Sequence, residues 1–205
     1  MSDTRADPMV LNGKILARSI EEQLRQRVDA VKEKLGYAPV LATIIVGRNP
    51  ASVTYVNMKC KACMRVGLEP LRVELPETTT TEELLAQIDR LNKDVRVSGI
   101  LLQHPVPRQI DEARCFNAIL PEKDVDGVNA ASFGAVSLGD PGYVSATPRG
   151  IMRILKEYKI PLEGKEAVVI GRSRILGKPA ALLLLGENCT VTICHSRTND
   201  LPEIV

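Results

Sequence analysis

The feature that most constrains the fold is a nearly unbroken apolar run, PVLATIIV at residues 39–46, followed at once by a glycine. Runs of this kind, rich in valine and isoleucine and without polar alternation, are typical of strands buried on both faces of a parallel sheet. A second apolar run at 97–103 and an alternating segment at 71–75 predict two further strands. We therefore expect an α/β protein built on a parallel sheet with crossover helices.

Helical patterns separate these strands. Residues 11–35 repeat apolar side chains at spacings of three and four and end before Gly36, which predicts a long amphipathic helix. Thr80 and Glu83 form a capping-box pattern that predicts a helix to about residue 91. Residues 111–120 predict a short helix after the third strand.

The helix between the first two strands has the clearest limits. Asn49 is a good N-cap, Pro50 suits the first helical position, and Gly67 suits the stop. Apolar side chains at helical spacing should face the core, namely Val53, Val56, Cys60, Cys63 and Met64. A second face carries Ser52, Tyr55 and Lys59, which suits a cleft wall where a phenol and an amine share a proton or a substrate. A solvated lysine beside a half-buried tyrosine is the simpler interpretation.

Composition excludes several classes of function. Charged residues make up 25% of the chain with a net charge of +2, a balance too mild for nucleic-acid or anionic-membrane binding. Aromatic residues make up only 3%, so a base-stacking platform is not expected. The polar N-terminus is unlike a signal peptide, and no apolar run is long enough to cross a bilayer.

Five cysteines lack the spacing of a disulfide framework, which favours a reducing, cytoplasmic setting. Cys60 and Cys63 match C-x-x-C, but they lie inside a predicted helix rather than at its N-terminus, where the dipole would lower a thiol pKa. With no second pair or nearby histidine, we expect core residues rather than a metal or redox site.

Ligand sites of open parallel sheets lie beyond the carboxyl ends of the strands. Gln103 stands there by sequence, and the charged segment 121–129 follows the next helix. Asp124 or Asp126 could accept hydrogen bonds from a ligand in that segment, although a solvated turn with an Asx cap would look the same. His104 is a candidate base that lacks a recognisable carboxylate partner.

The second half begins with residues 133–144, which are rich in glycine and serine and are expected to be irregular or linking. Thr147 and Pro148 predict the start of a helix to about residue 158, and we place a domain boundary here, giving domains 1–146 and 147–205. A strand at 166–170, a glycine turn, a helix to about residue 185 and a strand at 190–194 then follow.

Strand, glycine turn, helix and strand form the context of a dinucleotide site, although Ser173 stands where G-x-G-x-x-G has its second glycine, and a purely structural turn remains an alternative. NAD sites usually carry an acidic residue after the second strand. This chain has His195, Ser196 and Arg197 there instead. A cation and hydrogen-bonding groups suit the extra phosphate of NADP.

Six ordered motifs, covering almost the whole chain from about residue 10, resemble those of the methylenetetrahydrofolate dehydrogenase/cyclohydrolase family. They are Ser52-x-x-Tyr55-x-x-x-Lys59-x-Lys61, Gly99-Ile-Leu-Leu-Gln103-x-Pro105, Pro121-x-Lys-Asp-Val-Asp126-Gly127, Thr147-Pro148-x-Gly150, Val169-Ile-Gly-Arg-Ser173-x-Ile-Leu-Gly177-x-Pro179 and Cys194-His-Ser-Arg197.

The resemblance implies two α/β domains flanking a cleft, the second a Rossmann-like dinucleotide-binding domain, and a homodimer that uses NADP. It implies that Lys59 handles the proton and water of hydrolysis, Tyr55 lies along the folate ring, Gln103 holds the lysine, and Asp126 grips the pterin edge. The implied folate positions are Tyr55, Val56, Asn57, Met58, Lys59, Leu102, Gln103, His104 and Asp126, and the implied NADP positions are Gly171, Arg172, Ser173, Ser196 and Arg197. No metal is implied.

Three departures accompany the resemblance. His104 replaces a common leucine, Ala146 replaces a usual cysteine, and the chain stops where the family would continue, so we expect a C-terminally incomplete nucleotide domain.

Two other functions are open. In short-chain dehydrogenases a Tyr-x-x-x-Lys pair follows the glycine turn, whereas here it precedes it by more than a hundred residues. A non-catalytic folate or nucleotide binder is the second alternative.

Overall fold

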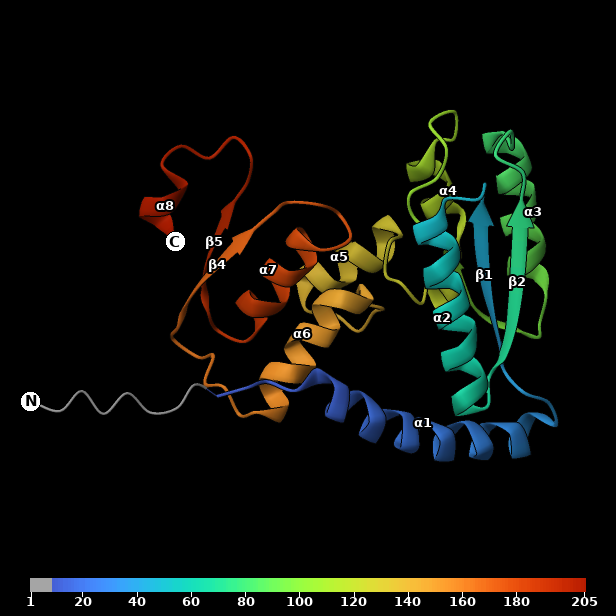
Figure 1. Cartoon of the computed structure of the whole chain (residues 1–205), viewed down its shortest axis with the longest axis horizontal. Helices are drawn as coiled ribbons and strands as arrows, with labels where there is room; N and C mark the ends of the chain where they lie inside the picture. The colour runs from blue at the N-terminus through green and yellow to red at the C-terminus, as the bar shows by residue number, and fades with distance from the viewer. Residues whose placement is uncertain (1–8) are drawn as a thin grey trace, which may run out of the picture.

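A computed structural model describes residues 9–205 and contains two α/β lobes (Figure 1). The polar segment before Met9, which the sequence suggests is not a signal peptide, lies outside the described residues. The first lobe comprises α1 (Gly13–Leu35), β1 (Val40–Val46), α2 (Pro50–Val66), β2 (Glu69–Leu75), α3 (Thr81–Lys93), β3 (Val97–Leu102) and α4 (Glu112–Ala118). The rest comprises η1 (Pro121–Lys123), α5 (Ala130–Leu138), α6 (Ala146–Glu157), β4 (Glu166–Ile170), α7 (Gly177–Gly186), β5 (Thr190–Cys194) and α8 (Leu201–Ile204).

The predicted parallel sheets are confirmed. In the first lobe the order is β2-β1-β3 with all pairs parallel, and the central strand β1 is buried along almost its whole length. In the second lobe β4 and β5 pair in parallel, from Glu166 opposite Thr190 to Ile170 opposite Cys194. The carboxyl ends of β4 and β5 therefore lie side by side, which brings the two predicted nucleotide-binding segments together.

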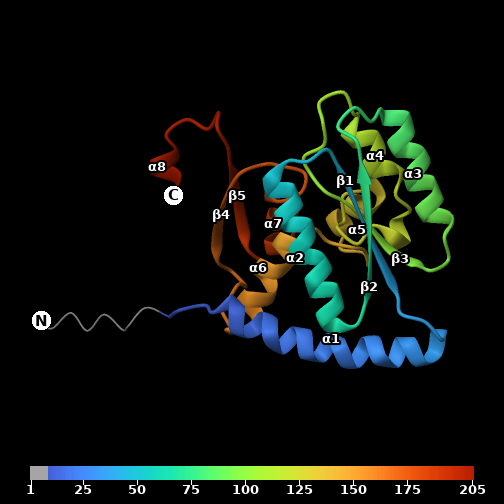
Figure 2. The same cartoon turned by 45° about the vertical axis from the view of Figure 1, so that its right-hand side comes forward.

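The main core lies between the first sheet and helices α3 and α4. Ile44 and Ile100 from the sheet meet Leu84 and Ile88 from α3 there, all fully buried. Helix α2 covers the other face of this sheet, on the side of the second lobe (Figure 2). The face of α2 away from the sheet is therefore directed toward the space between the lobes.

Helix α1 runs beneath both lobes in Figure 1 and contacts α2 and α6. The backbone N–H of Asn12 donates to the Tyr158 hydroxyl at the end of α6 (2.8 Å), and Arg65 of α2 pairs with Glu21 of α1. Of the apolar stripe on α1, only Leu16 and Val28 are buried. Among the described residues, no helix is long and apolar enough to cross a membrane.

Three local expectations were wrong. Residues 130–138 form helix α5, although residues 133–144 were expected to be irregular. Helix α6 begins at Ala146 with Ser145 at the cap position, so Thr147 lies inside the helix. Met64 was expected in the core, but it is 59% exposed, while Val56 and Cys63 are buried as predicted. The α2 limits at Asn49 and Gly67 and the Thr80–Glu83 capping box are confirmed.

Candidate active site

Lys59 and Gln103 meet at the carboxyl edge of the first sheet. Gln103 directly follows β3, and its backbone N–H donates to the Ile44 carbonyl (2.8 Å), which extends the sheet by one residue. Lys59 lies midway along α2, and its ammonium donates to Gln103 Oε1 (2.9 Å). The amine predicted on the cleft face of α2 is therefore held by the side chain predicted at the strand end.

The two aspartates of the 121–129 segment have different environments. Asp124 is fully buried and accepts hydrogen bonds from the backbone N–H groups of Val128 and Asn129 (3.1 and 2.9 Å), so its oxygens hold the turn. Asp126 is only partly buried, and the backbone N–H of Ala146 at the start of α6 lies near enough to its carboxyl to lower the pKa of that carboxyl. Of the two aspartates that the sequence left open, Asp126 is the one with oxygen atoms available to a ligand.

Lys59 and Asp126 lie close enough to affect each other's charge. Burial lowers the pKa of the Lys59 ammonium, and the negative charge of Asp126 partly offsets that effect. Burial raises the pKa of the Asp126 carboxyl, against the opposing effects of Lys59 and of the Ala146 N–H. Both shifts favour the neutral forms, so protons can be exchanged at this edge of the sheet more easily than between fully solvated groups.

The raised pKa of Asp126 predicts a pH-dependent gain in stability for Asp126→Asn. Between the carboxyl's ordinary pKa and its raised folded value, the folded state binds more protons than the unfolded state, so ionisation destabilises the fold. At neutral pH the asparagine variant should therefore unfold at a higher denaturant concentration than the wild type. This gain should vanish near pH 3, where both states are protonated. Urea titrations at the two pH values test this, and an equal gain at both would contradict the assignment.

The other predicted folate positions differ in accessibility. Tyr55 and Met58 are 58% and 61% exposed on α2, one turn or less from Lys59. Asn57 accepts a hydrogen bond from Arg72 (2.6 Å), which turns its amide toward β2. Val56 is fully buried and Leu102 is 3% exposed, so both support the site from within the core rather than lining it.

His104 has a partner that the sequence did not reveal. Its Nδ1 lies 2.6 Å from Glu112 Oε1 at the start of α4, and the two side chains are 47% and 29% exposed. The two residues are separated by a proline-rich loop without helical or strand periodicity, so spacing alone could not pair them. Their pairing supplies the carboxylate that a histidine base requires.

The second lobe meets the first beside Asp126. The Ser145 hydroxyl donates to the Ile175 carbonyl in the loop after β4 (2.6 Å), and Ile175 packs against the first lobe's core. Ser145 immediately precedes Ala146, whose backbone N–H lies beside the Asp126 carboxyl. A hollow of about 240 Å³ spans this junction, lined by Gly127, Val128, Ala130, Phe133, Arg174 and Lys178. The turn that carries Asp126 and the predicted nucleotide loop therefore share one junction between the lobes.

The glycine turn has the close packing expected of a dinucleotide-binding loop. The Gly171 N–H donates to the Cys194 carbonyl (2.7 Å), and Ser173 Oγ accepts from the N–H groups of Leu176 and Gly177 (3.1 and 3.3 Å). A Cβ at Gly177 would lie 2.1 Å from the Gly171 carbonyl oxygen, so only glycine fits. This is the role of the third glycine in the dinucleotide fingerprint.

The predicted cations and hydroxyls of the nucleotide site follow the two paired strands. Arg172 follows β4, while Ser196 and Arg197 follow β5, and all three are exposed. The Arg197 N–H donates to His195 Nδ1 (3.2 Å), which shapes the turn after β5. The residues present therefore fit an anionic dinucleotide with a phosphate near the two arginines.

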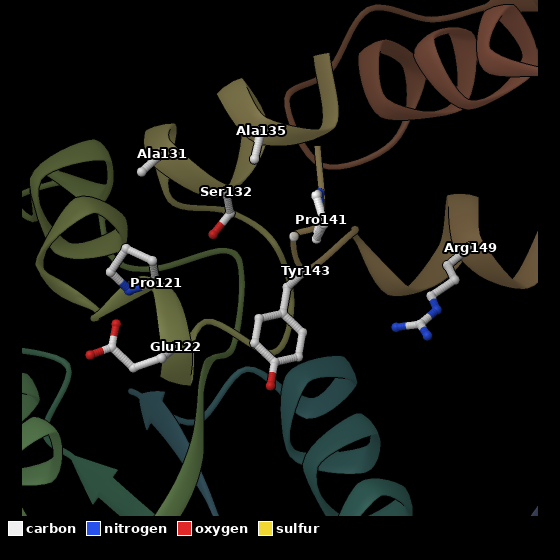
Figure 3. Close-up of a pocket in the computed structure, with 9 residues that line it drawn as sticks. Pro121, Glu122, Ala131, Ser132, Ala135, Pro141, Tyr143 and Arg149 are labelled. Carbon is white, nitrogen blue, oxygen red and sulfur yellow. The ribbon is translucent and has the colours of Figure 1, made fainter. Parts of the chain in front are cut away.

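A separate hollow of about 630 Å³ lies between η1, α5 and α6 (Figure 3). Tyr143 extends its ring across it, with Glu122 on one side and Arg149 on the other. Its lining comprises Pro121, Glu122, Ala131, Ser132, Ala135, Pro141, Gly142, Tyr143 and Arg149. None of the four predicted catalytic residues lines it, although the Tyr143 carbonyl packs against Gly127, next to Asp126.

The cysteines are all free in the structure, and all but Cys60 are buried. Burial raises the pKa of the Cys63 thiol, which disfavours the reactive thiolate. Within residues 9–205, no group of histidine, cysteine or acidic side chains is arranged to hold a metal ion.

Comparison with known proteins matches both lobes. Residues 11–126 match "Tetrahydrofolate dehydrogenase/cyclohydrolase, catalytic domain", and residues 145–205 match "Tetrahydrofolate dehydrogenase/cyclohydrolase, NAD(P)-binding domain". Two relatives called "Bifunctional protein FolD" are similar, from Acidobacterium capsulatum (60% identity) and Cellvibrio japonicus (59%). Each alignment covers 96% of this chain and 70% of the relative.

Solved structures agree with the sequence relatives. A FolD methylenetetrahydrofolate dehydrogenase/cyclohydrolase from Campylobacter jejuni superposes with a TM-score of 0.92 at 45% identity, covering 94% of this chain and 68% of that one. The Trypanosoma brucei FolD, solved with NADP cofactor and inhibitor, has a TM-score of 0.90 at 34% identity, covering 96% and 67%. Together with the two matched domains, these similarities show that the chain belongs to the tetrahydrofolate dehydrogenase/cyclohydrolase family.

Proposed function

We propose that this protein oxidises 5,10-methylenetetrahydrofolate to 5,10-methenyltetrahydrofolate with NADP and then hydrolyses the product to 10-formyltetrahydrofolate. It would serve one-carbon metabolism, in the cytoplasm and as a homodimer. The observation that carries the proposal is the Lys59–Gln103 hydrogen bond, with Asp126 close by and the glycine turn of the second lobe beside it. Family membership supports the same chemistry.

In this proposal residues 1–146 form the folate-binding catalytic domain, and residues 147–205 belong to the NADP-binding domain. Asp126 accepts hydrogen bonds from the pterin edge, because its oxygens, unlike those of Asp124, do not hold the turn. Tyr55 lies along the folate ring, a role that its exposure on α2 permits. Gly171, Arg172, Ser173, Ser196 and Arg197 hold NADP, whose nicotinamide supplies the hydride acceptor when bound.

Hydrolysis needs a group that can take a proton from water and return it. The lowered pKa of Lys59 increases the fraction of neutral amine at a given pH, and only the neutral amine can accept a proton. Gln103 accepts from Lys59 Nζ and so directs the amine toward the strand ends, where the substrate's reacting carbon would lie. Oxidation of the methylene bridge needs hydride transfer but little acid or base assistance.

Two assays test the function. Purified protein is mixed with 5,10-methylenetetrahydrofolate and NADP, and the absorbance of reduced nucleotide is followed, with NAD in a parallel reaction. In a second assay 5,10-methenyltetrahydrofolate is added alone and its decay is compared with the buffer rate. We expect both activities and a preference for NADP. Binding of both ligands without turnover would instead indicate a non-catalytic binder.

A further inference from the structure

His104 and Glu112 form a pair that the proposed chemistry does not use, yet it adjoins Gln103. We propose that this pair is a positioning device for the hydrolytic step: it holds the loop whose carbonyl directs the Gln103 amide toward Lys59. The inference rests on the proposed function, which assigns hydrolysis to Lys59. It gives His104, which differs from the family's common leucine, a role of its own.

Two hydrogen bonds fix the orientation of the Gln103 amide. Its Oε1 accepts from Lys59 (2.9 Å), while its Nε2 donates to the His104 carbonyl (2.7 Å). An ammonium can only donate and a carbonyl can only accept, so a single orientation of the amide satisfies both contacts. The His104 carbonyl therefore determines that the oxygen, rather than the nitrogen, of the amide faces Lys59.

The His104 carbonyl is held in place by a contact between its loop and α4. His104 lies in the loop between β3 and α4, and its imidazole bonds to Glu112 at 2.6 Å. Glu112 is the first residue of α4, whose N-cap Asp111 accepts a hydrogen bond from the Arg114 N–H. Cys115 and Phe116 anchor that helix in the core. A leucine at position 104 has no group that could reach this carboxylate.

The two proposed activities depend on Lys59 to different extents. Hydrolysis needs the amine directed at a water, whereas hydride transfer needs the carbon and the nicotinamide aligned. Loosening the loop should therefore slow hydrolysis more than oxidation. It should act on the turnover rate more than on the KM for folate, because Asp126 lies outside this loop, beside the Ala146 N–H of α6.

The experiment compares His104→Leu with His104→Gln, which keeps a hydrogen-bond donor for Glu112. We expect His104→Leu to lower kcat for hydrolysis about fivefold, the effect of one lost hydrogen bond, with little change in oxidation. His104→Gln should restore part of the loss. The matched control is Arg114→Gln, which breaks the other ion pair of α4, that with Glu82 (3.0 Å), without touching the Gln103 loop. Equal losses in His104→Leu and Arg114→Gln would overturn the proposal.

A second measurement separates this inference from the proposed function. In a Gln103→Ala background, His104→Leu should cause no further loss of hydrolysis, because the side chain through which it acts is gone.

A nitrogen NMR titration of the Lys59 side chain needs no turnover. His104→Leu should lower the Lys59 titration midpoint, since the ammonium loses a fixed acceptor. An unchanged Lys59 midpoint in the titration would refute the positioning role, and so would additive losses of hydrolysis in the double variant. Absence of both activities in the wild type would refute the proposed function alone.

Discussion

Replacing Lys59 by methionine should reduce hydrolysis of 5,10-methenyltetrahydrofolate by about 10²- to 10⁴-fold, the usual contribution of a positioned acid–base group. Methionine has a similar length and fills the same space beside Gln103, so the loss reflects the missing amine rather than a cavity. Oxidation of 5,10-methylenetetrahydrofolate should persist in large part, because hydride transfer does not use this proton. Steady-state rates of both reactions, measured on the same preparation, provide the test.

Lys61→Met is the matched control for this substitution. Lys61 lies two residues away on the same helix and is exposed, whereas Lys59 is partly buried. It should leave hydrolysis within a small factor of the wild type. If Lys59→Met keeps its hydrolysis, or if both variants lose it equally, Lys59 is not the group that transfers the proton.

Gly177→Ala should give the largest loss in the second lobe. The added Cβ would lie 2.1 Å from the Gly171 carbonyl oxygen and 2.8 Å from the Arg172 nitrogen, both backbone atoms that cannot rotate away. Forcing α7 and the glycine turn apart should cost about 3 kcal/mol or more, the upper end of overpacking effects. The free energy of unfolding should therefore decrease, and the NADP dissociation constant should increase. Urea unfolding and nucleotide titration measure the two effects.

Gly186→Ala tests whether that loss is specific to the contact. Gly186 ends the same helix, and a Cβ there would meet no atom within 4 Å. Alanine is the better helix former, so this variant should be neutral or slightly stabilising. If Gly177→Ala proves as harmless as Gly186→Ala, the close approach of α7 to the turn does not limit the fold.

Elements with strong local signals were predictable from the sequence. Asn49 and Gly67 mark both ends of α2, and the structure shows each residue in its capping role. The buried strand β1 and the paired strands β4 and β5 follow from short apolar runs between turns. In these segments local chemistry and tertiary packing favour the same conformation.

Helix α5 shows why other parts were missed. Its sequence AASFGAVSL contains Gly134 and two serines, which favour irregular structure, and its apolar residues are spread around the helix rather than gathered on one face. Packing against α4 and α7 stabilises it. The available signals were its caps, because Asn129 accepts from the Ala131 N–H at the start and Gly139 adopts a φ of 79° at the end. An N-cap residue and a C-cap glycine separated by the length of a helix predict that helix even where no apolar face does.

The site itself was only partly predictable. The residues themselves predicted Lys59 on a cleft face and Gln103 at a strand end but left Asp124 and Asp126 as alternatives, and the family resemblance pointed to Asp126. The structure separates the two physically, because the Asp124 carboxylate turns inward to backbone N–H groups that follow it by four and five residues. The His104–Glu112 pair also required coordinates, since a loop of variable geometry separates the two residues.

The adjacency of Ser145 and Ala146 has a thermodynamic consequence. The Ser145 hydroxyl binds the loop expected to receive the nucleotide, and the N–H of the next residue, Ala146, lies beside the carboxylate expected to receive the pterin. Any ligand that stiffens one of these contacts lowers the conformational entropy that the other ligand must remove. Bound nucleotide should then increase the affinity for the folate, and bound folate should increase the affinity for the nucleotide by the same factor.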